Sequence, residues 1–428
     1  MGGILYGFKN TNEESQKDLL SHKSLQIRKN VDVVICNGVF AEIGEHLLKK
    51  YEQLPQLQII DAQNLVLMPG LIDCHTHSIF AGSRSNETIL KSQGLSFDEI
   101  AKKGGGIIST VKATRACTKE ELTHKFKVHA QQALSRGVVL LETKTGYGLN
   151  VAEEKKLLES LYDAYLDNTQ HDLPMLAPTY FGPHTESPDF RGLDNYLQTL
   201  VEDLPNIALM GDNAVKKGIA LPLAADIFLE RNYFTKEHAS IWLGACLQHG
   251  LDIHIHADEF SRSGGAEIAV ELARRLEQTS SKKRDKGRVL SVDHCQYATE
   301  SDLIKLSKLG VAAVVLPATS FFSNIPYIDS GRLRSSEIRV AIASNFNPGT
   351  APMNNLWFSC YLSLSQCGFS LAEIYAGVTI NAAFALGVEN SFGSIEQGKR
   401  ATMVGFLGNA PEDFFNSPIG DHVQYVVL

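Results

Sequence analysis

Apolar, β-branched runs that end in polar residues recur through the middle of the chain, and stretches with helical periodicity separate them. We count eight such runs, at residues 67–77, 137–148, 174–184, 224–230, 251–259, 288–295, 310–317 and 339–349. Between them, residues 119–137 and 234–250 place apolar side chains on one helical face and end in glycine, a common helix stop. Strands that alternate with helices indicate parallel β-α units, and eight units predict an α/β fold with a (β/α)8 TIM-type barrel. A doubly wound sheet is the alternative, but it would spread the polar strand ends along an open edge.

The two ends of the chain lack this alternation. Short antiparallel strands are predicted there, at residues 32–44, 57–68, 393–408 and 422–428. We therefore expect residues 1–66 and 387–428 to join in a small β-sandwich domain beside a barrel of residues 67–386.

Composition narrows the class of protein. The chain has 428 residues, of which 44% are hydrophobic and 21% charged, with a net charge of −8. Lys and Arg are scattered and the charged segment 279–288 is expected to be a solvated insertion, so nucleic acid is not an expected partner. The first 20 residues lack a secretory pattern, and no apolar run reaches the roughly 18 residues of a membrane span. Seven cysteines without CxxC spacing indicate reduced thiols. We expect a cytoplasmic protein without a membrane partner.

Histidines stand at the ends of the first, fifth and sixth runs. His75 and His77 are two residues apart on a strand, so both point to the same side. His256 ends the fifth run and His294 ends the sixth, and the ends of parallel strands converge in a barrel. Imidazoles gathered in this way indicate a metal site. His254 shares the strand face of His256 but lies deeper, so either a core position or a ligand role is open to it.

Several longer motifs go beyond the histidine pairs. They are "PGLIDCHTHSIFAGSRSNE", "GGGIISTVKATRA", "KTGYGL", "FGPH", "IHADE", "FNPG" and "GSIEQGK". On these motifs the chain resembles the imidazolonepropionase family of the amidohydrolase superfamily, along about its whole length. The resemblance implies hydrolysis of 4-imidazolone-5-propanoate to N-formimidoyl-L-glutamate in histidine degradation. It also implies one Zn²⁺ or iron ion per chain and a homodimer. The fourth run has no lysine of the kind that bridges two metals in some superfamily members, which favours one metal.

The resemblance also implies roles for individual residues. Metal ligands fall on His75, His77, His256 and position 345. The chemistry of the implied reaction then suggests catalytic roles for Glu259, as a proton shuttle, for His294, and for position 345. Substrate contacts fall on Arg84, Tyr147, His184, Glu259, Asn347, Gly349 and Thr350.

Other interpretations of these residues stay open. Arg84 suits the carboxylate of the substrate, or it pairs with Glu87 at the surface. Tyr147 either leans over a ligand or packs at a turn, and His184 either binds the substrate ring or caps its loop. His294 either hydrogen-bonds the reacting oxygen or orients the metal ligands.

Position 345 departs from the family pattern, because it is Asn where the family has Asp. An amide is a neutral, weak ligand and cannot accept a proton from water near pH 7. Asp293 is no expected substitute, because it precedes His294 and should face away from the barrel interior. Thr402, where the family usually has an acidic residue, is a second departure and favours natural divergence. An engineered inactive variant, a paralogue with altered activity and a metal-dependent binder without turnover all remain open, as does a deaminase acting on another ring.

Overall fold

The computed structural model describes residues 3–7, 26–95, 99–100, 103–166, 172–279 and 287–428. Most of the segment considered for a secretory leader, and residues 280–286 of the charged segment, lie outside these ranges. Within the ranges, no helix combines the length and the apolarity that crossing a bilayer requires.

The centre of the molecule is a parallel barrel, which confirms the predicted fold class. Its strands are β5 (Leu71–Asp73), β6 (Val138–Lys144), β7 (Met175–Tyr180), β8 (Ala224–Ala225), β9 (Phe228–Leu229), β10 (Asp252–Ala257), β11 (Val289–His294), β12 (Ala312–Val315) and β13 (Val340–Ile342). They pair in chain order from β5 to β13, with β9 added beside β10. At the seam, the amide of Asn345 donates to the carbonyl of His75, and the amide of His77 donates to the carbonyl of Phe346. These two bonds join the first and last strands just where the site residues begin.

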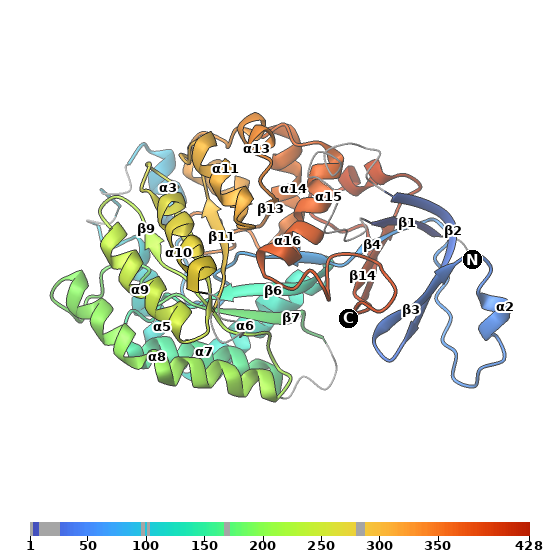
Figure 1. Cartoon of the computed structure of the whole chain (residues 1–428), viewed down its shortest axis with the longest axis horizontal. Helices are drawn as coiled ribbons and strands as arrows, with labels where there is room; N and C mark the ends of the chain where they lie inside the picture. The colour runs from blue at the N-terminus through green and yellow to red at the C-terminus, as the bar shows by residue number, and fades with distance from the viewer. Residues whose placement is uncertain (1–2, 8–25, 96–98, 101–102, 167–171, 280–286) are drawn as a thin grey trace.

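Helices follow the strands and surround the barrel (Figure 1). They are α3 (Ser85–Ser92), α5 (Ile107–Ala116), α6 (Lys119–Leu134), α7 (Val151–Leu166), α8 (Leu193–Lys216), α9 (Lys236–Gln248), α10 (Gly265–Thr279), α11 (Glu300–Lys308), α12 (Pro317–Ser323), α13 (Ser330–Ser336), α14 (Leu356–Ser365), α15 (Leu371–Gly377) and α16 (Ile380–Ala385). The two helices predicted from periodicity are α6 and α9. Each begins at a threonine whose side chain accepts from the third helical amide, Thr118 for α6 and Thr235 for α9.

Barrel strands are buried on both faces, since helices cover the outside and other strands the inside. All seven residues of β6 and all six of β11 are buried. Alternation along β6 therefore sends Glu142 and Lys144 into the barrel, and a charged group in such a place needs close partners. This requirement determines much of the site below.

The two ends of the chain meet in one sheet beside the barrel. Figure 1 shows the blue N-terminal strands and the red C-terminal strands together at one side of the molecule. The sheet order is β15 (Val423–Val427), β14 (Met403–Leu407), β4 (Leu65–Pro69), β1 (Gly3–Gly7), β2 (Gln26–Cys36) and β3 (Val39–Gly44). The short helix α2 (Leu48–Tyr51) and a 3-10 turn at Pro411–Asn416 lie in the connections.

Two predicted runs are each divided in the structure. Run 67–77 was expected to be one barrel strand, but residues 65–69 pair with β14 and β1, and the barrel strand starts at Leu71. Gly70 marks the change, because a Cβ there would lie 2.4 Å from Val139 Cγ2. The expected boundary at residues 66 and 67 thus falls inside β4. Run 224–230 is split into β8 and β9, with Asp226 between them.

Candidate metal and active site

Four histidines gather at the carboxyl ends of the barrel strands. His75 and His77 follow β5, His256 lies in β10, and His294 ends β11. None of the four is more than 5% exposed. The ring centroid of His256 lies 4.4 Å from that of His75, 5.3 Å from that of His77 and 5.4 Å from that of His294. The fold thus brings the histidines of the first, fifth and sixth runs together.

The donor atoms of this cluster fit a cation. Ligand atoms of His75, His256 and His294 lie within 4.8 Å of one another, and Nε2 of His77 lies 3.4 Å from Nε2 of His256. None of the described residues offers a hydrogen bond to the buried Nε2 of His75 or to the buried Nδ1 of His77. Burial holds the pKa of His75, of His77 and of His294 well below the ordinary value, so these imidazoles are neutral. Neutral imidazole nitrogens without partners are suitable metal ligands.

Carboxylates behind the cluster set the orientation of two rings. Asp293 Oδ2 lies 2.6 Å from Nδ1 of His75, and Asp226 Oδ2 lies 2.8 Å from Nδ1 of His256. Each bond leaves Nε2 of its histidine directed toward the cluster, which is how such partners prepare a metal ligand.

The prediction that Asp293 faces away from the interior is wrong. Asp293 is fully buried inside the barrel, and alternation along β11 places Ser291 beside it on the same face. His294 still reaches the cluster because its backbone has left the extended conformation, with φ of +76°. Positive φ is uncommon for such a residue and is found where a functional site constrains the backbone.

Asn345 stands at the seam of the barrel beside His75. Its φ is +52°, a left-handed conformation that Asn tolerates well. Its Nδ2 donates to Thr319 Oγ1 at 2.7 Å, while its buried Oδ1 has no hydrogen-bond partner among the described residues. The amide oxygen is therefore available as a neutral ligand.

The loop after β13 is braced by its own side chains. Asn347 Oδ1 accepts the amides of Gly349 and Thr350, both at 2.8 Å, and Asn347 Nδ2 donates to the carbonyl of Asn345. This bracing brings Gly349 against Arg84, so that a Cβ on Gly349 would lie 2.1 Å from Arg84 Nη1.

Arg84 does pair with Glu87, but not as a surface pair. Nε and Nη2 of Arg84 donate to the two carboxylate oxygens of Glu87 at 2.9 and 2.8 Å, and the side chains are only 10% and 3% exposed. The pair therefore fixes the direction of the guanidinium beside the loop of Gly349.

Aromatic groups line the side of the cluster near His77. The ring of His184 stacks on that of His77 with the ring centroids 5.4 Å apart, and the ring centroid of Tyr147 lies 5.5 Å from that of His184. His184 Nδ1 lies 2.9 Å from the carbonyl of Gly146, and burial lowers the pKa of His184 to about 3. A neutral His184 with Nδ1 as the donor leaves Nε2 as an acceptor.

Glu259 lies next to His294, with 3.5 Å between Glu259 Oε2 and His294 Nε2. Burial, and then the charge of Glu230, raise the pKa of Glu259 well above its ordinary value. Glu230 in turn accepts the amides of Glu259 and Phe260. Burial therefore favours the protonated form of Glu259 beside the cluster.

Three charged residues of the site were missed by reasoning from the sequence: Glu142, Lys144 and Asp226. All three are fully buried, and the Lys144 ammonium lies 2.8 Å from Glu142 Oε1 and 2.9 Å from Asp226 Oδ2. A signal was present, because the apolar strand "VVLLETK" carries two opposite charges at positions that share one face. His254 is also placed by the structure: its Nδ1 lies 2.8 Å from Ser291 Oγ, deep in the barrel.

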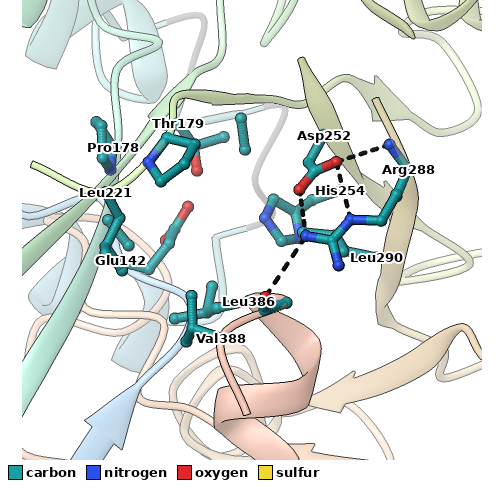
Figure 2. Close-up of a pocket in the computed structure, with 14 residues that line it drawn as sticks. Glu142, Pro178, Thr179, Leu221, Asp252, His254, Arg288, Leu290, Leu386 and Val388 are labelled. Atoms are coloured by element: carbon teal, nitrogen blue, oxygen red, sulfur yellow. Dashed lines mark hydrogen bonds and ion pairs between the residues drawn. The ribbon is translucent and has the colours of Figure 1, made fainter. Parts of the chain in front are cut away.

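A small cavity of about 50 Å³ lies at the other end of the barrel (Figure 2). Ala224 and Asp252, which line it, are the first residues of their strands, whereas the histidine cluster lies at the strand ends. The cavity therefore does not belong to the mouth of the site.

Comparisons with known proteins agree with this architecture. The amidohydrolase family model (Amidohydro_3) matches residues 184–409. A protein of Bdellovibrio bacteriovorus named imidazolonepropionase is 32% identical over 388 residues, covering 90% of this chain and 84% of its own length. One of Rubrobacter xylanophilus with the same name is 33% identical, covering 94% and 91%.

Solved structures show the fold alone. A zinc-bound adenosine deaminase from Xanthomonas campestris superimposes with a TM-score of 0.67 at 15% identity, covering all of this chain and 91% of that one. The sequence relatives are closer and span nearly the whole chain. The chain belongs to the imidazolonepropionase family of the amidohydrolases.

Proposed function

We propose that the chain hydrolyses the ring amide of 4-imidazolone-5-propanoate to N-formimidoyl-L-glutamate, using one Zn²⁺ or iron ion. The observation that supports this most is the buried Nε2 of His75, which has no hydrogen-bond partner among the described residues. The rings of His77, His256 and His294 surround that of His75. His75, His77 and His256 would hold the ion, with Asn345 Oδ1 as a weak fourth ligand. A bound divalent ion polarises a carbonyl and lowers the pKa of water toward roughly 7.

The surrounding residues suit the two ends of this substrate. Arg84 would bind the propanoate carboxylate beside the loop of Gly349 and Thr350. Tyr147 and His184 would contact the ring. Because the Glu87 pair fixes the guanidinium, binding would need little reordering of a long side chain.

Proton movement falls to Glu259 and His294. Hydrolysis adds water across the ring carbon–nitrogen bond, so one proton must reach the departing nitrogen. Glu259, whose protonated form is favoured by burial, would donate that proton and regain one from water. His294, 3.5 Å from Glu259, would hydrogen-bond the oxygen on which charge develops.

Asn345 limits this scheme, because its amide cannot accept the first proton from water near neutral pH. We infer that the wild-type chain turns over slowly and that Asn345→Asp restores about 100-fold or more in kcat, the usual contribution of a general base. The substitution is expected to fold, because Asp also tolerates positive φ and the Thr319 hydroxyl can rotate to donate to it.

The test follows the ultraviolet absorbance of the imidazolone with metal-loaded wild type and with Asn345→Asp. Decay in the variant, with slower or absent decay in wild type, supports the proposal and locates the lesion. The absence of decay in both forms would contradict the hypothesis that the chain is a hydrolase of this substrate. A thermal shift with N-formimidoyl-L-glutamate but no turnover in either form would identify a binding protein instead. Sedimentation of the same samples tests the homodimer inferred from the family.

A further inference from the structure

Lys144 is a fully buried lysine at the end of β6, inside the barrel and behind the histidine cluster. Its amide donates to the carbonyl of Thr76, between the two histidines of "HTH". A buried ammonium is costly unless several acceptors surround it. The acceptors that surround it are therefore informative.

Three carboxylates from three parts of the barrel face the ammonium. Nζ lies 2.8 Å from Glu142 Oε1, 2.9 Å from Asp226 Oδ2 and 3.7 Å from Asp293 Oδ2. None of these side chains is exposed. Without a cation between them, the three groups could not all stay charged at this depth, because like charges so close repel one another strongly.

Each carboxylate also supports part of the histidine cluster. Asp293 bonds the ring of His75, and Asp226 bonds both the ring and the backbone amide of His256. Glu142 Oε2 accepts the amide of Thr76 at 3.0 Å, which fixes the backbone between His75 and His77. One ammonium therefore connects to His75 and to His256 through one carboxylate each, and to His77 through Glu142 and the backbone of Thr76.

The carboxylates have the geometry of a cation site of their own. Ligand atoms of Asp226, His256 and Asp293 lie within 4.8 Å of one another, and Lys144 Nζ lies beside both carboxylates. Glu142 and His254 line the cavity at the foot of the barrel (Figure 2), so close packing does not enclose these side chains on every side. Charge pairing with Lys144 therefore contributes to holding Glu142 in place. The ammonium thus stands where a second metal ion would otherwise balance the charge.

We propose that Lys144 is a positioning residue: a fixed internal cation that takes the place of a second metal ion and aligns the metal-binding histidines through Glu142, Asp226 and Asp293. The proposal rests on the proposed function only in requiring that the histidines bind a metal. It gives a reason for a single metal that differs from the missing lysine of the fourth run.

The test compares Lys144→Met with Lys399→Met as the matched control. Lys399 is also buried, at 8% exposure, but its Nζ bonds Ser394 and the carbonyl of Glu389, residues outside the cluster. The dissociation constant for Zn²⁺ is measured by competition with a chromophoric chelator, and the Co²⁺ absorption spectrum reports ligand geometry. Lys144→Met should bind Zn²⁺ about 10- to 100-fold more weakly with an altered Co²⁺ spectrum, while Lys399→Met matches wild type.

Two results would overturn the proposal: unchanged Zn²⁺ affinity and Co²⁺ spectrum in Lys144→Met, or a second tightly bound ion without loss of the first. If Lys144→Met does not fold, Lys144→Arg keeps the charge but not the point-like ammonium, and should show a smaller loss of affinity with a shifted spectrum. An unshifted spectrum and wild-type affinity in Lys144→Arg would then count against positioning. These assays contain no substrate and measure metal binding alone. Failure of the wild-type chain to bind metal would contradict the proposed function. Wild-type Zn²⁺ affinity in Lys144→Met would contradict only the role of Lys144.

Discussion

Replacing Gly349 with Ala should weaken carboxylate binding without touching the metal site. A Cβ at this position would lie 2.1 Å from Arg84 Nη1 and 2.5 Å from Cζ, whereas ordinary contacts begin at 3.4 Å. The guanidinium must therefore retreat by about 1.3 Å, the difference between 3.4 and 2.1 Å. Gly349 is not among the residues with positive φ, so the backbone itself accepts alanine. The expected effect is thus confined to the position of Arg84.

The size of the effect follows from the bonds at stake. A hydrogen bond to a charged group contributes about 1.5–3 kcal/mol, so losing the alignment of one such bond should weaken binding about 10- to 100-fold. The assay is a thermal-shift titration of the metal-loaded protein with N-formimidoyl-L-glutamate, which does not depend on turnover. Zn²⁺ affinity is measured alongside and should not change.

Gly244→Ala is the matched control, because a Cβ there meets nothing within 4 Å and the residue lies inside α9. This control should bind the ligand like wild type and be slightly more stable, since alanine favours helix. Wild-type ligand affinity in Gly349→Ala would refute the assignment of Arg84 to the carboxylate. A loss of both ligand and metal binding would refute the claim that the effect is local.

Two further predictions concern pH and metal. Burial lowers the pKa of His254 to about 3, so the folded chain keeps this ring neutral while the unfolded chain protonates it below its ordinary pKa of about 6.5. Stability should therefore fall as the pH drops from about 6.5 toward 3, by up to about 1.4 kcal/mol per pH unit from this residue. In His254→Gln, the free energy of unfolding, measured by urea titration, should fall less between pH 6 and pH 5 than in wild type. The control His249→Gln, at an exposed position, should keep the slope of wild type. Equal slopes in wild type and both variants would contradict the reasoning. Removal of metal by a chelator should lower Tm, because Zn²⁺ at 100 times its dissociation constant stabilises the fold by about 2.7 kcal/mol; an unchanged Tm in calorimetry would show that no ion is bound.

Strand periodicity is a local feature of the sequence, and the convergence of parallel strand ends is common to all barrels. Both could therefore be predicted from the sequence. His75, His77, His256 and His294 stand at the ends of recognisable runs, so the geometry of any barrel brings them together. The motifs likewise allowed the family to be predicted from the sequence, and relatives that match most of the chain confirm it.

The carboxylates behind the histidines could not be inferred in the same way. The bond from His75 to Asp293 joins residues 218 positions apart, and the register that aligns His256 with Asp293 is set by packing of the whole barrel. Strict alternation gave the wrong side for Asp293, because the left-handed backbone of His294 breaks the period at the strand end. The division of run 67–77 between two sheets could not be predicted either, because it depends on the close approach of Val139 to Gly70.

The metal content of the purified chain tests the central claim most directly. The protein is saturated with Zn²⁺, dialysed against metal-free buffer and measured by atomic emission against its concentration. Three imidazole ligands, a weak amide ligand and an ammonium in the second cation position predict about one ion per chain. Two ions would contradict the role of Lys144, and none would mean that the histidine cluster with Asn345 is not a metal site.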